Sequence, residues 1–134
     1  MTDKLKWVFK NIHLIISLAI VIPTAIIYGS PLILSNFFNI QVNTNDLSNM
    51  LKAIMCLYLG ISFVWILGIF KTAYWKIATQ LNVLFMVTLA TGRVLSMVSD
   101  GLPTGGYIFA VLAEFVLGLF SIYQLKKYKT EQNY

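Results

Sequence analysis

Four charged residues lie within or at the ends of stretches that are otherwise apolar: Lys52, Arg93, Asp100 and Glu114. If these stretches cross a bilayer, each unpaired charge costs about 2.5–3.5 kcal/mol on insertion scales, so the charges must pair or line a polar cavity. A guanidinium or ammonium group can bind an anionic or carbonyl-bearing molecule, and a carboxylate can bind a guanidinium or exchange a proton. The chain therefore needs elements that bring these residues together.

The composition indicates that these elements lie in a membrane. Of the 134 residues, 58% are hydrophobic and only 11% are charged, far from the usual composition of soluble domains. A hydrocarbon core about 30 Å thick requires roughly 20 apolar residues per helix, so four spans and their loops use nearly the whole length. We predict an all-α integral membrane protein, an antiparallel bundle of four transmembrane helices that forms one domain over residues 1–134.

The four helices are expected at about residues 12–30, 47–70, 77–98 and 107–125. Pro23 is expected to kink the first helix. The Asn-rich segment 35–46 is expected to be a loop with a short interfacial piece, in which Asn45 or Asp46 caps the second helix. The hexapeptide KTAYWK at 71–76 has the composition of a membrane interface and is expected to link the second and third helices.

Basic residues predict the orientation of the bundle. Eight lysines lie on one side of this topology: Lys4, Lys6, Lys10, Lys71, Lys76, Lys126, Lys127 and Lys129. The opposite loops, 35–46 and 99–106, contain acids but no Lys or Arg. The positive-inside rule then places both termini in the cytoplasm. The net charge of +5 follows from this topology, and we expect no nucleic-acid binding because the basic residues form no stripe with aromatic residues.

The depths of the internal charges are similar. Lys52 lies about five residues after the start of the second helix, Arg93 about five before the end of the third, and Glu114 about seven after the start of the fourth. All three helix ends face the outer side, so the charges share a layer roughly 7–10 Å below it at 1.5 Å per residue. Asp100 lies at the rim of this layer, which is formally neutral.

Arg93 and Glu114 are natural partners because a short connection joins their helices. Stripes of mainly small residues on or beside these charges predict close helix packing. Thr88, Gly92, Ser96 and Asp100 recur every four positions in the third helix, and Ala110, Glu114, Gly118 and Ser121 form a similar stripe in the fourth. Tyr107 shares the face of Glu114 and can supply a hydroxyl. The candidate polar cluster therefore comprises six residues: Lys52, Arg93, Ser96, Asp100, Tyr107 and Glu114.

Three functions remain open for this cluster. It could be an outer cavity that binds a small polar or anionic molecule or a lipid headgroup, or a set of ion pairs that stabilises a structural or accessory subunit. It could also serve a small enzyme or transporter in which Glu114 acts as acid or base and Arg93 stabilises charge. No second catalytic group is evident, so no catalytic residue is assigned, and a neighbouring Arg93 disfavours Glu114 as a simple proton carrier.

The remaining single residues carry weaker signals. His13 begins the first predicted helix and is expected at the membrane interface, and Cys56, one turn from Lys52, is expected to be a packing residue. One histidine and one cysteine offer no metal-ligand cluster, so we expect neither a metal nor a cofactor. The turn at 100–103 is either a simple bend or a lid over the outer opening. Membrane lipid is the expected partner, and the small-residue stripes also permit a homo-oligomer.

Three segments carry a resemblance to a known family: GRVLSMVSDGLP at 92–103, Glu114 in the following span, and LYLGIS at 57–62. The chain resembles a bacterial family of small four-helix membrane proteins, domain-of-unknown-function family 4345, and more distantly the DoxX-type membrane proteins. The resemblance implies the bacterial cytoplasmic (inner) membrane and no established activity. It also implies an arginine at the position of Lys52 and a glycine pair within 53–56, and this chain has neither.

Overall fold

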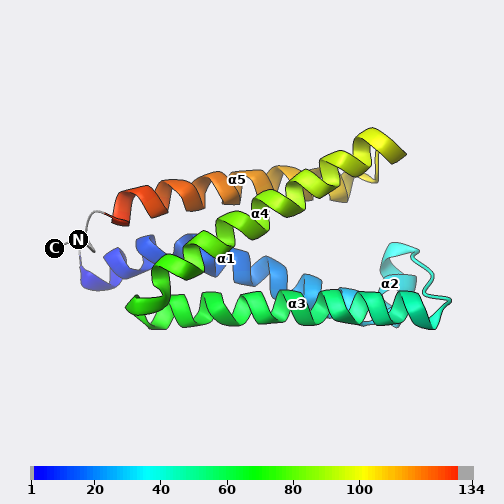
Figure 1. The fold of residues 1–134 in the computed structure, drawn as a ribbon, viewed down its shortest axis with the longest axis horizontal. Coiled ribbons are helices and arrows are strands. Elements are labelled where there is room, and N and C mark those ends of the chain that lie inside the picture. The colour runs from blue at the N-terminus through cyan, green and yellow to red at the C-terminus, as the bar shows by residue number, and fades with distance from the viewer. Residues whose placement is uncertain (1, 130–134) are drawn as a thin grey trace.

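The computed structural model describes residues 2–129 of the chain, without the side chain of Lys129. Residue 1 and residues 130–134 of the predicted domain lie outside the described residues. Five helices follow one another along the chain (Figure 1): α1 Asp3–Gly29, α2 Pro31–Phe38, α3 Asn45–Phe70, α4 Thr72–Asp100 and α5 Gly105–Lys129. No strand occurs within residues 2–129.

The four long helices, α1, α3, α4 and α5, are each long and apolar enough to cross a membrane. All four also expose large apolar side chains on the surface of the bundle, such as Ile26, Phe63, Leu95 and Leu119. In a bilayer these side chains contact acyl chains, and association of the helices depends on close packing and polar contacts rather than on the hydrophobic effect. The predicted all-α bundle with four membrane-spanning helices is therefore confirmed.

The helices pack as two pairs, α1 with α3 and α4 with α5. Contacts between α3 and α4 join the two pairs. We call the end with the start of α1, Lys71 and the end of α5 the terminal end, and the end with α2 and residues 101–104 the loop end. The two pairs lie close together at the terminal end and diverge toward the loop end (Figure 1). The loop end is therefore the end at which space opens between the pairs.

Two helices extend further than predicted. α1 begins at Asp3 instead of residue 12, because residues 3–11 contain neither proline nor glycine and continue the helix. The hexapeptide KTAYWK is almost entirely helical, with only Lys71 between α3 and α4. Its Trp75 is buried and packs edge-to-face against His13 and Tyr128, with ring centroids 6.1 and 5.9 Å away. Packing inside the bundle therefore replaces the predicted interfacial link.

The segment after α1 forms the short helix α2, which begins at Pro31. Proline is tolerated in the first turn of a helix because its missing N–H would have no partner there. Asn39 ends α2 in the left-handed conformation, with φ at 54°. The cap of α3 is Thr44, whose hydroxyl accepts a 3.1 Å hydrogen bond from the Leu47 N–H. The prediction that Asn45 or Asp46 caps this helix was wrong, because α3 already begins at Asn45.

The two small-residue stripes behave differently. Gly118 of α5 packs against α4, where an added Cβ would lie 3.0 Å from Cγ2 of Val87. In α4, Thr88, Gly92, Ser96 and Asp100 are exposed, and an added Cβ at Gly92 would meet no atom within 4 Å. The predicted packing is correct for α5 and wrong for α4 within this chain. α4 is rotated so that Arg93 faces α5, while Thr88, Gly92 and Ser96 face the open space between the helix pairs, where they line a cavity with Tyr28 and Tyr58.

Candidate functional site

Arg93 of α4 and Glu114 of α5 form an ion pair near the loop end. The Arg93 Nε donates to both carboxylate oxygens of Glu114, at 3.0 Å to Oε1 and 3.1 Å to Oε2. The two side chains are only 19% and 12% exposed. A short turn at 101–104, with Gly101 at a φ of 97°, returns α5 beside α4 and brings the two residues together. The ion pair predicted from the sequence is present.

This pair uses only one of the five N–H donors of the guanidinium. Within residues 2–129, no protein acceptor lies at full hydrogen-bonding distance from either Nη of Arg93, and the Tyr28 hydroxyl on the opposite wall interacts more weakly with the guanidinium. The guanidinium also lies over the ring of Tyr107, with 5.4 Å from Cζ to the ring centroid, a distance at which a cation is attracted to an aromatic face. Arg93 is thus held in place by two neighbours while four of its donors remain available.

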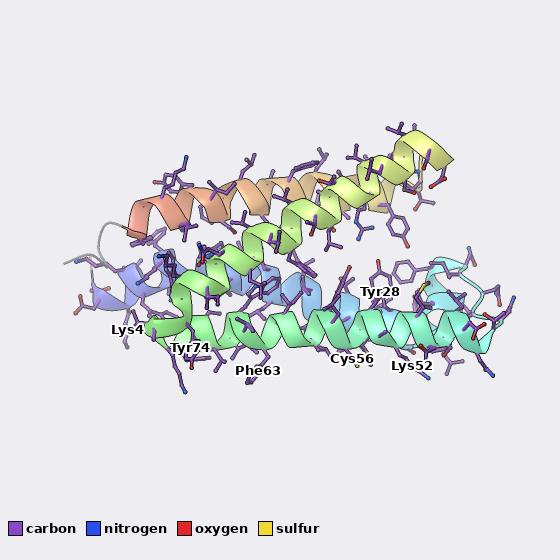
Figure 2. The ribbon with its side chains drawn as sticks, viewed as in Figure 1. Lys4, Tyr28, Lys52, Cys56, Phe63 and Tyr74 are labelled. Carbon is purple, nitrogen blue, oxygen red and sulfur yellow. The ribbon has the colours of Figure 1, made fainter. Side chains whose placement is uncertain are left out.

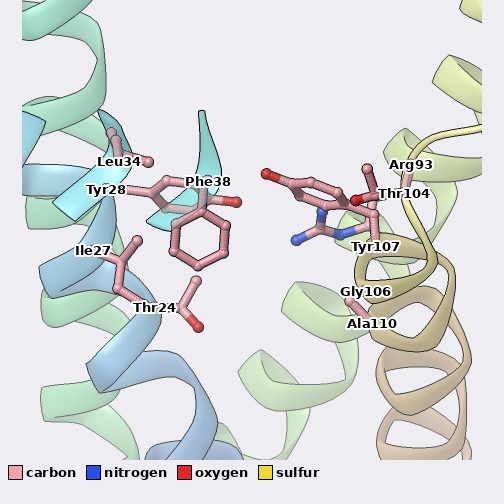
Figure 3. A pocket seen from close by; sticks show the side chains of 10 residues that line it. All are labelled: Thr24, Ile27, Tyr28, Leu34, Phe38, Arg93, Thr104, Gly106, Tyr107 and Ala110. Carbon is pink, nitrogen blue, oxygen red and sulfur yellow. The ribbon is translucent and has the colours of Figure 1, made fainter. Parts of the chain in front are cut away.

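A cavity of about 240 Å³ lies in front of these donors. We call it the Arg93 cavity, and α1, α2, α4, α5 and the loop before α5 form its walls. Its lining residues are Thr24, Ile27, Tyr28, Leu34, Phe38, Arg93, Thr104, Gly106, Tyr107 and Ala110. The hydroxyls of Tyr28 and Tyr107 point into this space from opposite walls, and the Arg93 guanidinium lies beside Tyr107 (Figure 3). The cavity therefore combines hydrogen-bond donors on two walls with apolar side chains from α1 and α2.

The surroundings of Arg93 are open in several directions. Besides the Arg93 cavity, Arg93 lines three further cavities of about 260, 190 and 300 Å³. Ser96 and Tyr107 also line the cavity of about 260 Å³, and Ser96 also lines the cavity of about 300 Å³. Ser96 and Tyr107 thus lie near Arg93, as the predicted cluster requires.

Lys52 does not join this cluster. Its side chain is exposed and points away from α4 and α5 (Figure 2). The buried face of α3 carries Tyr58, which lies six residues, or about 240° of helix rotation, from Lys52. The prediction matched the depth of Lys52 to that of Arg93 but could not specify the rotation of α3. Cys56 is likewise exposed on the outer face of α3 (Figure 2), so its predicted packing role was wrong.

Asp100 lies at the rim but does not contact Arg93. It is exposed, and its carboxylate accepts a 2.9 Å hydrogen bond from the hydroxyl of Ser96 one turn earlier in α4. Tyr28 is a lining residue that the sequence prediction missed. The only signal for it was depth, since it lies near the end of α1 and therefore at the level of Arg93.

A second group of polar residues is buried toward the terminal end. We call this group the terminal polar layer: His13, Thr79, Asn82, Ser121 and Gln124. The His13 Nε2 lies 3.1 Å from the Thr79 hydroxyl, and the Ser121 hydroxyl donates to Asn82 Oδ1 at 2.7 Å. His13 is fully buried. Its ring packs between helices of the bundle, because α1 begins ten residues before it, and its predicted depth at the membrane interface stays a prediction.

Residues 2–129 contain no group of three or more His, Cys, Asp or Glu side chains that could hold a metal ion. The groups that the site offers for hydrogen bonding are the Arg93 guanidinium, the tyrosine hydroxyls and the Glu114 carboxylate.

The fold and this site define a multi-pass membrane protein with an ion pair and a cavity at one end of a helical bundle. Residues 9–125, which include all six residues of the predicted cluster, match the family described as a domain of unknown function (DUF4345). The chain belongs to this family, so the predicted family is confirmed, while the likeness to DoxX-type proteins stays a prediction. Comparison with curated proteins and with solved structures gave no match.

Proposed function

We propose that this protein binds a small molecule in the Arg93 cavity through an oxygen of that molecule. The observation that supports this function is the orientation of Arg93. Its Nε is bound to Glu114, while its Nη donors adjoin the cavity and have, within residues 2–129, only a weaker interaction with the Tyr28 hydroxyl. A carbonyl oxygen or an acidic oxygen is the complementary group, because guanidinium N–H groups only donate.

The walls of the cavity limit the size and character of the bound molecule. About 240 Å³ is below the roughly 300–1,000 Å³ typical of sites for drug-sized ligands. Tyr28 and Tyr107 offer hydroxyls to further polar atoms, and Ile27, Leu34 and Phe38 offer apolar surface. A small polar or anionic molecule, or the headgroup of a lipid, suits these walls.

We also propose an orientation for the bundle. The lysines at the start of α1, at 71 and 76 and near the end of α5 lie at the terminal end, whereas Asp46 and Asp100 lie at the loop end. The positive-inside rule favours a cytoplasmic terminal end, with the Arg93 cavity toward the outer side of a bacterial cytoplasmic membrane. Reporter fusions after residue 134 and within residues 39–44 test this, and a cytoplasmic signal from the second fusion would contradict it.

Retention of a bound compound tests the binding function. We expect the protein purified in nanodiscs to carry a compound that native mass spectrometry detects after release of the lipids. Arg93→Gln removes charge-assisted hydrogen bonds worth about 1.5–3 kcal/mol, so occupancy should fall roughly 10- to 100-fold. Lys52→Gln is the matched control, because it removes another cation of the bundle that faces outward. Equal occupancy in wild type and Arg93→Gln would contradict the proposal.

A purely structural role is the second candidate function. The bifurcated hydrogen bond from Arg93 Nε to both carboxylate oxygens of Glu114 favours it, because this contact ties α4 to α5. A structural pair predicts no compound in the cavity and no dependence of any bound compound on Arg93. The retention experiment therefore separates the two functions.

A further inference from the structure

A second cavity continues from the ion pair toward the middle of the bundle. It measures about 190 Å³ and shares Thr24, Arg93 and Ala110 with the Arg93 cavity. Deeper in the bundle its walls are mainly apolar side chains from α1, α4 and α5: Ile20, Val21, Met86, Leu89 and Leu117. Tyr58 of α3 also lines it, and Phe109 lies at the level of Ala110. We call this second cavity the apolar cavity. A molecule bound to Arg93 thus has a hydrophobic space directly beneath its polar group.

The apolar cavity borders the outer surface of the bundle between α1 and α5. Ile20 of α1 and Phe109 of α5 line it and are also 45% and 73% exposed. α1 packs mainly on α3, and α5 packs mainly on α4. The contact between α1 and α5 is much smaller than either of these. In a bilayer this surface faces acyl chains, and a ligand can enter sideways from the lipid.

The charge of the site limits the head of such a ligand. Among residues 2–128, Arg93 and Glu114 are the only charged residues that line either cavity, and their charges cancel. An anionic head would add a net charge to an apolar environment, which is strongly unfavourable. An uncharged carbonyl oxygen can accept from the Arg93 Nη donors without adding charge.

We infer that the ligand is a lipid-like molecule with an uncharged carbonyl head, an ester, amide or ketone, and a hydrocarbon chain. This inference rests on the proposed function, because the head occupies the Arg93 cavity. The chain occupies the apolar cavity and enters between α1 and α5. The site thus selects for an amphipathic molecule from the membrane rather than for a water-soluble anion.

Matched probes test the inference in nanodiscs of ether-linked phosphatidylcholine, whose bilayer contains no ester carbonyl that could compete. Two photoreactive probes share one long chain with a diazirine near its end, and carry either a methyl ketone or a sulfonate head. Short-chain analogues of both heads, each with its own diazirine, report on the Arg93 cavity alone. Cross-linked peptides are mapped by mass spectrometry.

We expect the long ketone to label the α5 segment around Leu117, at a level about tenfold or more above the long sulfonate. Arg93→Gln should lower this labelling about tenfold. Ala113→Phe, which fills the apolar cavity, should abolish labelling by the long ketone but preserve binding of the short ketone. Ala53→Phe adds the same bulk on the exposed face of α3 and should change nothing.

The outcomes separate this inference from the proposed function. If the short probes bind with Arg93 dependence but the long ketone does not label α5, the inference fails and the proposed function stands. Stronger labelling by the long sulfonate than by the long ketone would overturn the inference that the head of the ligand is uncharged. If neither short nor long probes bind with Arg93 dependence, both proposals fail. Retained short-ketone binding by Ala113→Phe shows that this variant is folded.

Discussion

The two polar regions of this bundle differ in how closely the helices pack around their polar side chains. In the terminal polar layer, His13 and Thr79 meet each other, as do Asn82 and Ser121, and all four side chains are fully buried. At the loop end, Arg93 uses one donor on Glu114, and cavities lie around its remaining donors. The difference follows from the divergence of the two helix pairs (Figure 1). Close packing at one end holds the bundle together, and divergence at the other leaves room for a ligand.

Because the two ends are packed differently, we expect substitutions at them to change the stability of the bundle by different amounts. In lipid, helix association depends on packing and on hydrogen bonds between helices, so the terminal end should be sensitive to added volume. The loop end should be sensitive to loss of charge balance and tolerant of added volume on its outward faces.

The largest effect is expected from removing one partner of the ion pair. Glu114→Leu leaves the Arg93 charge without its carboxylate, and we expect a loss of about 3 kcal/mol in the free energy of unfolding, at the low end for buried pairs because Arg93 adjoins cavities. The double variant Arg93→Met/Glu114→Leu should recover most of this loss. Titration with denaturing detergent measures both. A double variant less stable than Glu114→Leu would contradict the pairing argument.

Added volume should distinguish the packed terminal end from the open loop end. A Cβ at Gly68 of α3 would overlap the Ala78 Cβ of α4, so Gly68→Ala should destabilise by about 1–3 kcal/mol. Gly92→Ala is the matched control, since its Cβ would meet no atom within 4 Å. We expect Gly92→Ala to be neutral or slightly stabilising, because alanine favours helix more than glycine does. Equal destabilisation by both would show that the ends do not differ in packing.

A hydrogen bond in the terminal polar layer should contribute a smaller amount. Asn82→Ala removes the 2.7 Å acceptor of Ser121, and interhelical hydrogen bonds in membranes are worth about 0.6 kcal/mol on average, up to about 1.7. We expect a loss in that range and no change in the compound retained at the loop end. Loss of the bound compound in a folded Asn82→Ala variant would show that the two regions are coupled.

The smallest effect is expected at Lys52, although it is an intramembrane cation by sequence. Its exposed side chain faces away from the cluster, so Lys52→Gln should change the free energy of unfolding by no more than about 0.5 kcal/mol. Retention of the compound should be unchanged. A marked loss of either property would place Lys52 in the site after all.

Much of this architecture was predictable because it depends on one-dimensional patterns. Apolar runs of spanning length identified the four long helices, and matched depth together with a short connection identified the pair of Arg93 and Glu114. Helix rotation was not predictable in the same way. Lys52 has the correct depth on the wrong face, and the stripe at Gly92 in α4 faces a cavity instead of a packed helix.

Two further features depended on context that the sequence pattern does not contain. His13 was assigned to an interface because α1 was expected to begin at residue 12, and nine additional helical residues place it inside the bundle. Tyr28 belongs to the site only because the two helix pairs diverge and α2 closes one wall of the cavity. The divergence of the two helix pairs depends on how all four long helices pack together, so it cannot be predicted from the sequence of any single segment.

The most direct test of the contrast between the two ends is the rate at which single cysteines react with a small water-soluble thiol reagent. In a Cys56→Ser background, Ala110→Cys places a thiol in the wall of the Arg93 cavity, and Ser121→Cys places one in the terminal polar layer on the same helix. Reaction requires access of water to the thiolate. The account predicts modification of Ala110→Cys at least about tenfold faster than of Ser121→Cys. Equally slow modification of both would mean that the loop end is as dry and packed as the terminal end, and would contradict the proposed ligand site.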